Sequence, residues 1–148
     1  MRKRMTTACA ALMFAAVAAC DEKLSDLTGP TPDLKPTFSS IQQNIFQAAD
    51  RSGRAACTQC HTPGGIRTAS ILFLTPTLAY AQLVNARAAG KRGAIRVIPG
   101  DPENSYLIHK LEGRPGIAGA RMPDIVPYLT DGQIQVIKRW IELGAQNN

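Results

Sequence analysis

The sequence predicts an all-α fold, a small domain of helices joined by long loops. Two observations support this prediction: apolar residues recur at helical spacing in four segments, and the stretches between those segments are rich in glycine and proline. The chain has 148 residues, the length of one domain, and is 45% hydrophobic and 19% charged. This composition excludes the disordered, collagen-like and polytopic membrane classes of protein.

The first two helices are predicted from spacing and capping signals. Order is expected to begin near Phe38, where Ser40 and Gln43 fit a capping box. The apolar residues that follow at helical spacing are Ile41, Ile45, Phe46 and Ala49. A second helix is predicted over residues 76–88, with Leu78, Leu83 and Val84 on its apolar side.

The last two helices follow a short extended run at residues 95–98. Asp101 as N-cap and Pro102 in the first turn predict a third helix, with Leu107, Ile108 and Leu111 on its apolar side. Thr130 and Gln133 form another capping box, and Gly144 closes the final helix. Its apolar stripe consists of Ile134, Ile137, Trp140 and Ile141. The loops are long for so small a domain, so a further group is expected to hold them.

Residues 1–19 are predicted to be an export signal. Arg2, Lys3 and Arg4 precede an uncharged, alanine-rich run over residues 8–19. A bilayer-spanning helix needs about 20 apolar residues, so this run is too short for a permanent anchor. The alternative is a short buried helix.

The end of this signal predicts attachment to a membrane. The sequence Val17-Ala18-Ala19-Cys20 resembles the bacterial lipobox, in which the cysteine thiol receives a diacylglycerol. Cys20 is therefore the predicted lipidation site; ordinary cleavage that leaves a free Cys20 is the alternative. Residues 20–37 are rich in proline and acids, and are interpreted as the lipidated cysteine and a flexible tether to the domain at 38–148.

The motif that carries chemistry is Cys57-Thr58-Gln59-Cys60-His61, a C-x-x-C-H sequence typical of covalent haem attachment. Two thiols three positions apart on a helical turn can reach both vinyl groups of one porphyrin, and the adjacent His61 is then directed at the iron. The motif has two alternative interpretations. A zinc site would need His109 as a further ligand, and thiol redox chemistry would need a thioredoxin-like βαβ pattern, which the sequence lacks.

Met122 is the candidate for a second axial ligand. Met1, Met5 and Met13 all lie in the predicted signal, so Met122 is the single methionine of the mature chain. It precedes Pro123 in a loop before the last helix; the alternative is a core methionine. His109, on the helical face of Ser105 and Glu112, is interpreted as a solvated surface histidine.

Several runs of sequence resemble class I cytochromes c, and more narrowly the bacterial planctomycete-type cytochrome c domains. Besides the haem motif they are residues 79–85 (AYAQLVN), 97–107 (VIPGDPENSYL), 110–113 (KLEG), 121–123 (RMP) and 140–145 (WIELGA). The likeness covers about residues 41–145. It implies helices and loops wrapped around one covalent haem c, with His61 as proximal and Met122 as distal iron ligand. Residues 50–54, just before the motif, look like an insertion relative to this family.

The expected function is that of a lipid-anchored monohaem electron carrier, not an enzyme, at the periplasmic or outer face of a bacterial membrane. Its expected partners are a redox donor and acceptor, acidic or membrane-bound, and the lipid bilayer through Cys20. Phe46 and Trp140 are expected to pack at a helix crossing beside the haem. The alternatives are a haem enzyme or gas sensor with an open sixth position, and an assembly lipoprotein that keeps haem as a structural element.

The net charge of +6 divides unevenly along the chain. Cleavage before Cys20 leaves +3, and the domain from residue 38 onward carries +5. Residues 51–121 hold ten bases and three acids, a local +7 around the haem motif and the methionine loop. The predicted export of the protein makes a nucleic-acid partner improbable. The charge therefore predicts either a docking face for an acidic redox protein or a solubilising surface with arginines that pair with propionates.

Overall fold

The computed structural model describes residues 34–65 and 72–148, and this part of the chain is helical. Its elements are α2 (Phe38–Ile41), the π-helical turn η1 (Gln42–Phe46), the 3₁₀ turn η2 (Cys57–Gln59), α3 (Ala79–Leu83), α4 (Tyr106–Glu112) and α5 (Asp131–Glu142). Within these ranges extended backbone forms isolated bridges and no strand. The all-α prediction is confirmed for the described residues. The predicted signal, Cys20 and most of the tether lie outside them.

Helix α5 is where the predicted signals and the structure agree best. The Thr130 hydroxyl accepts a hydrogen bond from the Gln133 N–H, and Gln133 Oε1 accepts one from the Thr130 N–H, so the capping box is complete. The buried stripe consists, as predicted, of Ile134, Ile137, Trp140 and Ile141. Gly144 follows the helix with a φ of +95°, a conformation that glycine adopts without steric cost.

The N-cap of α2 is Thr37, and the predicted capping box at Ser40 is wrong. The Thr37 side chain accepts a hydrogen bond from the Ser40 N–H at 3.3 Å, and its backbone is extended, as is usual at an N-cap. Ser40 is thus already inside the helix. The helix continues as η1 and ends at Phe46, so the predicted apolar position Ala49 lies beyond it and is exposed.

Helix α3 is much shorter than the predicted helix over residues 76–88. Val97 donates its N–H to the Leu83 carbonyl at 3.1 Å, and Val84 forms a parallel bridge with Val97. The chain therefore leaves the helix in order to pair with the extended run at 95–98. Such a contact between segments distant in sequence overrides local helix propensity.

Helix α4 begins at Tyr106 and has Ser105 as its N-cap, four residues after the predicted N-cap Asp101. Asp101 caps a preceding turn instead, where its Oδ1 accepts a hydrogen bond from the Asn104 N–H at 3.1 Å. Ser105 is fully buried; its hydroxyl donates to the Asp101 carbonyl and accepts from the Ile98 N–H. The prediction that the face of Ser105 is solvated is therefore wrong.

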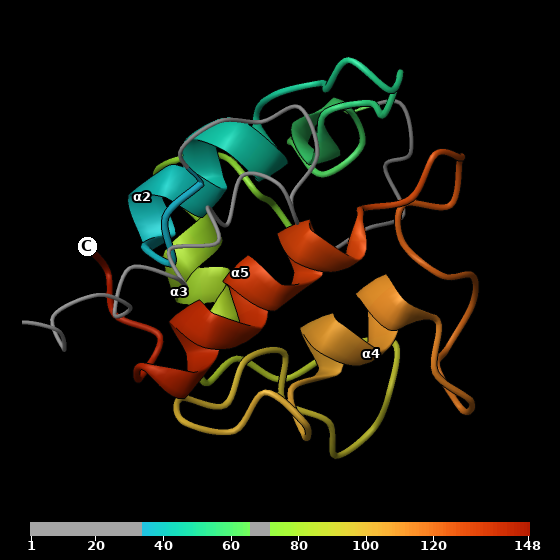
Figure 1. Cartoon of the computed structure of the whole chain (residues 1–148). Helices are drawn as coiled ribbons and strands as arrows, with labels where there is room; N and C mark the ends of the chain where they lie inside the picture. The colour runs from blue at the N-terminus through green and yellow to red at the C-terminus, as the bar shows by residue number, and fades with distance from the viewer. Residues whose placement is uncertain (1–33, 66–71) are drawn as a thin grey trace, which may run out of the picture.

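Helix α5 runs through the middle of the molecule, with α2 and α3 on one side and α4 on the other (Figure 1). The Phe38 ring joins these layers, since it lies 5.2 Å from the Tyr80 ring and 5.5 Å from the Trp140 ring. Trp140 thus has Phe38 as its aromatic neighbour, where Phe46 was expected. Phe46 belongs to the same core and also lines the cavity described below.

Four charged side chains connect α4, α5 and the turn that precedes α4. Lys138 lies 2.8 Å from Glu112 and 2.9 Å from Glu103, and Arg114 forms ion pairs with the same two carboxylates. Burial alone would raise the pKa of Glu112, but the hydrogen bonds from Lys138 and Arg114 lower it overall. Each carboxylate therefore faces two cations.

We expect Glu112→Gln to weaken the acid dependence of folding stability. Because the pKa of Glu112 is lower in the folded chain than its usual 4.5, its ionisation stabilises the fold above that pH, and the stabilisation is lost as pH falls through and below it. Chemical unfolding between pH 3 and 7 measures this. The variant should be less stable at pH 7 and lose less on acidification, whereas Glu142→Gln, in an exposed pair with Arg139, should follow the wild-type profile.

Candidate functional site

A cavity of about 610 Å³ opens between η2, α4 and the loop that follows α4. Its walls are mainly apolar, and five of the lining residues are small: Ala55, Ala56, Ala88, Ala89 and Gly90. Cofactor pockets usually fall between about 300 and 1,000 Å³ and are lined in this way. The cavity therefore has the size and the surface of a site for a large, mainly apolar ligand.

The two cysteines lie on one tight turn at the cavity wall. The Cys60 and His61 N–H groups both donate to the Cys57 carbonyl, at 3.2 and 2.9 Å. Gly65 is needed close by, because a Cβ there would lie 2.6 Å from the Cys60 carbonyl oxygen. Both thiols are free, and burial raises the pKa of the Cys57 thiol. The turn thus presents two free thiols and the adjacent histidine to the same cavity.

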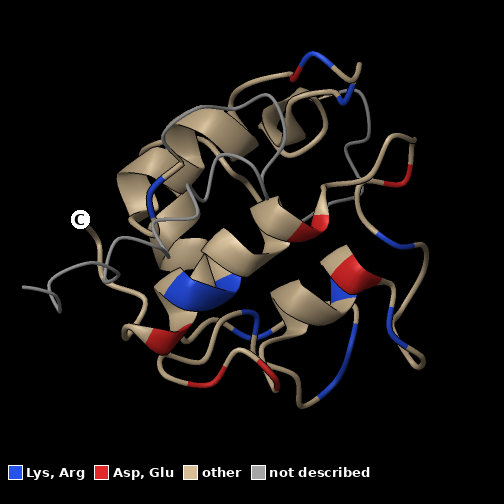
Figure 2. Cartoon of the chain, viewed as in Figure 1, with Lys and Arg blue, Asp and Glu red and all other residues tan. Residues whose placement is uncertain are grey.

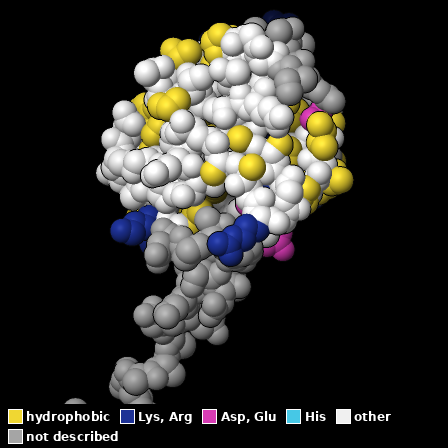
Figure 3. Space-filling model, turned by 90° about the horizontal axis from the view of Figure 1, so that it is seen from above, with side chains coloured by type: hydrophobic (Ala, Val, Ile, Leu, Met, Phe, Trp, Pro, Cys, Tyr) yellow, Lys and Arg dark blue, Asp and Glu magenta, His cyan; other side chains and the backbone are white. Residues whose placement is uncertain are grey.

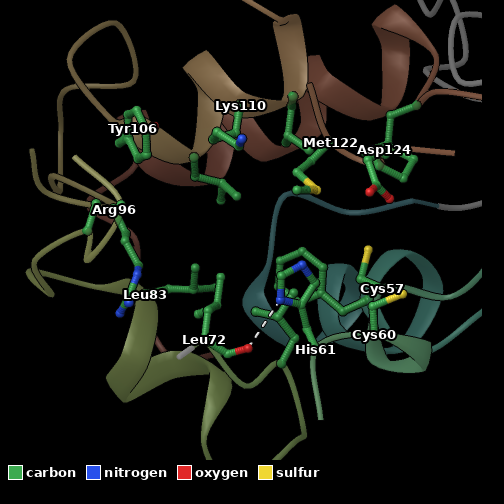
Figure 4. A pocket seen from close by; sticks show the side chains of 18 of the residues that line it. Cys57, Cys60, His61, Leu72, Leu83, Arg96, Tyr106, Lys110, Met122 and Asp124 are labelled. Atoms are coloured by element: carbon green, nitrogen blue, oxygen red, sulfur yellow. Dashed lines mark hydrogen bonds between the residues drawn. The ribbon is translucent and has the colours of Figure 1, made fainter. Parts of the chain in front are cut away.

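His61 is oriented by a hydrogen bond between its Nδ1 and the Leu72 carbonyl at 3.1 Å (Figure 4). Burial lowers the pKa of His61, so the neutral ring is favoured at neutral pH. A neutral ring that donates from Nδ1 carries a lone pair on Nε2, the tautomer required of a metal ligand. The hydrogen bond at Nδ1 therefore leaves Nε2, with its lone pair, as the atom of His61 that could bind a metal.

The Leu72 carbonyl is itself held in place by the backbone of residues 72–74. The Leu74 N–H donates to the His61 carbonyl at 2.7 Å, and Gln42 Nε2 donates to the Leu74 carbonyl at 2.8 Å. From the other side, Gln82 Oε1 accepts from the Phe73 N–H at 2.6 Å. Two glutamines from different helical segments therefore fix the acceptor that orients His61.

Met122 lies on the cavity wall that faces His61 (Figure 4). Its N–H donates to the Lys110 carbonyl at 2.8 Å, and Arg121 Nε donates to the Leu111 carbonyl at 2.7 Å. Lys110 Nζ donates to the carbonyls of Ala118 and Ala120 in the same loop. The loop is thus bound along the end of α4, and this holds the thioether at the cavity.

Arg96 and Tyr106 lie on the side of the cavity away from the cysteines (Figure 4). Arg96 Nη1 donates to the Gln82 carbonyl at 2.8 Å. Burial lowers the pKa of Arg96, yet a guanidinium stays charged under all ordinary conditions. This end of an otherwise apolar cavity therefore suits an anionic group.

The surface around the cavity carries both charge and apolar side chains. Lysines and arginines alternate with acids on the loops around α4 and α5 (Figure 2). The Asp124 carboxylate favours the charged form of His61 and Lys110 opposes it, although burial dominates the pKa of this ring. Beyond Met122, Ile125 and Val126 are exposed. On the face of the molecule drawn in Figure 3, apolar side chains gather along one edge.

Cys57, Cys60, His61 and Met122, which the sequence predicted as one site, line one cavity. His109 is not part of it; its Nε2 lies 2.6 Å from the Glu103 carbonyl oxygen, outside the lining residues. The zinc alternative, which needed His109, therefore finds no support in this geometry. Within residues 34–65 and 72–148, no three histidine, cysteine or acidic side chains gather as metal ligands. Cys20 lies outside the described residues.

The sequence interpretation missed Leu72, Gln42, Gln82, Arg96 and Lys110. Leu72 acts through its backbone carbonyl, which leaves no trace in a side-chain pattern. Arg96 did carry a signal, since it is a lone charge between the apolar Ile95 and Val97.

Comparison with known proteins gives no relative: no family model, no curated protein and no solved structure matches this chain. Among the described helices, none is both long enough and apolar enough to span a bilayer.

We expect Gln82→Leu to destabilise the protein by about 1–3 kcal/mol, because it leaves the half-buried Phe73 N–H without its acceptor. Unfolding in urea measures this change. Gln135→Leu, on the exposed side of α5, is the control and should change stability by less than about 0.5 kcal/mol. Equal stabilities of the two variants would contradict the role given to Gln82.

Proposed function

We propose that this protein is a monohaem c-type cytochrome that carries single electrons between redox partners. The observation that carries the proposal is that the two thiols of C-x-x-C-H, His61 and Met122 line one apolar cavity, with His61 and Met122 on facing walls (Figure 4). In this proposal Cys57 and Cys60 hold one haem c through thioether bonds. His61 is the proximal iron ligand and Met122 the distal ligand.

The donor set of the cavity fits a haem better than a bare metal ion. A haem iron brings four porphyrin nitrogens and needs only two axial ligands from the protein. A neutral imidazole and one thioether supply those two. The alanine and glycine walls leave room for a flat ring, and Arg96 provides a cation at the end away from the cysteines, where the propionates of a thioether-bound haem point.

The bound haem would supply a one-electron couple between ferric and ferrous iron, and the protein residues determine its properties. Met122 favours the ferrous state, because a thioether is a soft ligand, and so raises the reduction potential relative to bis-histidine ligation. Leu72 keeps His61 in the ligating tautomer. Phe46, Leu74, Leu83 and Leu129, all buried, exclude water from the cavity walls. A carrier, rather than an enzyme, follows if Met122 occupies the sixth position.

The place and partners of this carrier are also proposals. Lipidation of Cys20 would tie it to the outer face of a bacterial membrane, in the periplasm or an equivalent compartment. Arg87, Lys91 and Arg92 lie on the loop that contributes Ala88 to Gly90 of the cavity wall, and residues 84–100 contain no acid. A basic rim of this kind favours an acidic donor or acceptor.

Met122→Ala tests the axial ligand. We expect the variant to lose the weak far-red sulfur-to-iron band of the ferric protein and to have a lower reduction potential. Visible spectroscopy and redox titration measure both. Ile125→Ala, at an exposed neighbouring position, should keep the band. Absence of the band in the wild type, together with rapid binding of carbon monoxide to the reduced protein, would instead favour the haem enzyme or gas sensor.

Cysteine variants test covalent attachment. Cys57→Ser and Cys60→Ser should each retain one thioether bond, so the α band of the pyridine haemochrome moves to longer wavelength because one vinyl group stays conjugated. Haem staining on a denaturing gel and mass spectrometry measure the bond directly. Cys20→Ser is the control; it should keep both thioethers and lose only its attachment to the membrane. A wild-type chain without haem stain would refute the proposed function.

A further inference from the structure

Arg54 is a fully buried arginine in the segment that leads from η1 to the cysteine turn. Burying a guanidinium is costly unless its charge is paired and its N–H groups are hydrogen-bonded. Both conditions are met here. Arg54 Nε donates to Asp50 Oδ2 at 3.0 Å, and its two terminal nitrogens donate to the carbonyls of Ile45, Ala48 and Ala55 at 3.0–3.1 Å.

The sequence around Arg54 is organised to hold this cation. Asp50 Oδ1 accepts hydrogen bonds from the backbone N–H groups of Ser52 and Arg54, and from the Ser52 hydroxyl. Burial would raise the pKa of Asp50, but the hydrogen bonds from Ser52 and Arg54 lower it, so the carboxylate is ionised at neutral pH. Gly53 has a φ of +90°, which closes the turn. Residues 50–54 therefore form a structured turn that contains a buried ion pair.

This ion pair lies directly behind the cysteine turn. The Ile45 carbonyl accepts a hydrogen bond from Arg54 Nη1 at 3.1 Å and another from Cys57 Sγ at 3.6 Å. The cation and the thiol therefore share one acceptor. Ala55, whose carbonyl also accepts from Arg54, lines the cavity, as does Cys57.

The two charges of the pair differ in their access to water. The Arg54 side chain has no exposed surface, whereas that of Asp50 is 12% exposed. Solvent screens a charge at the surface more strongly than one in the interior. Because water reaches Asp50 and not Arg54, we expect Asp50 to cancel the field of Arg54 at the cavity only in part.

We propose that Arg54 is a positioning and tuning residue that raises the reduction potential of the haem site through a permanent buried positive charge behind Cys57, and that Asp50 moderates this effect. The inference rests on the proposed function, since it assumes a haem at Cys57 and Cys60. Reduction from ferric to ferrous iron adds one electron from a one-electron donor and lowers the charge of the site by one. A nearby fixed cation therefore destabilises the ferric state more than the ferrous state.

Three variants separate charge from structure, and all are measured as full-length haem-loaded protein by redox titration. Arg54→Met removes the cation and should shift the midpoint potential to a lower value. Asp50→Asn leaves the cation without its counter-ion and should shift the potential to a higher value. Arg54→Lys keeps the charge but cannot reach all four acceptors, so its potential should stay near that of the wild type while it unfolds at lower denaturant concentration.

Arg51→Met is the matched control, because Arg51 is an exposed arginine in the same turn and solvent screens its charge. It should leave the potential unchanged. The shifts of Arg54→Met and Asp50→Asn should persist at high salt, because the charge responsible is buried. If Arg54→Met does not fold, the pair of Asp50→Asn and Arg54→Lys still decides the question, since only the first should shift the potential.

The inference is overturned if Asp50→Asn leaves the potential unchanged or lowers it, or if Arg54→Lys shifts it as much as Arg54→Met does. The latter result would mean that Arg54 acts only through packing. Failure of the proposed function looks different, because the wild-type chain would then carry no covalent haem and give no haem couple to titrate.

Discussion

The hydrogen bond between His61 Nδ1 and the Leu72 carbonyl joins the C-x-x-C-H turn to a segment eleven residues further along the chain. It determines which ring nitrogen of His61 is left for a metal. The bond depends in turn on the backbone of residues 72–74, which Gln42 and Gln82 hold from opposite sides. Through these contacts η1, η2 and α3 are all tied to one imidazole. A shift in any of them would change the direction of the His61 ring.

The cavity also explains the unusual balance of helix and loop in this domain. The aromatic side chains are few, and several residues of the packed core also line the cavity, among them Phe46, Leu83 and Leu111. The loop that carries Met122 donates hydrogen bonds to the carbonyls of Lys110 and Leu111 at the end of α4. In the other direction, the Lys110 side chain donates to the Ala118 carbonyl in this loop. Loops of this length need fixed partners to keep one conformation. In the proposed function the haem would be the largest of those partners.

Two positively charged side chains lie near the cavity, one at its wall and one behind it. Arg96 lies at the cavity wall, where a cation can neutralise the acidic groups of a ligand. Arg54 lies behind the wall and is fully buried. In the proposed function its charge would act on the haem iron without contact with the haem. The remaining surface bases are mixed with acids, as in the network of Glu103, Glu112, Arg114 and Lys138. The net charge alone does not distinguish a base at the cavity wall, a buried base behind it and a base in a surface ion pair.

The sequence by itself determined the features that local patterns encode. The capping box and apolar stripe of α5, the cysteine turn with His61, and Met122 as candidate ligand all depend on residues a few positions apart or on a unique residue type. The predictions from the sequence were wrong where local signals competed with distant contacts. Thr37 rather than Ser40 caps α2, and α4 starts after Asp101. Helix α3 ends early because the chain pairs with residues 95–98. Only the tertiary structure decided the roles of Leu72, Gln82, Arg96 and Arg54. The lone charge of Arg96 between two apolar residues is visible in the sequence, but its contact with the Gln82 carbonyl is not. Leu72 acts through its backbone carbonyl, and the side chains of Gln82 and Arg54 bind backbone groups of other segments. Contacts of this kind leave no periodic or spaced pattern in the chain.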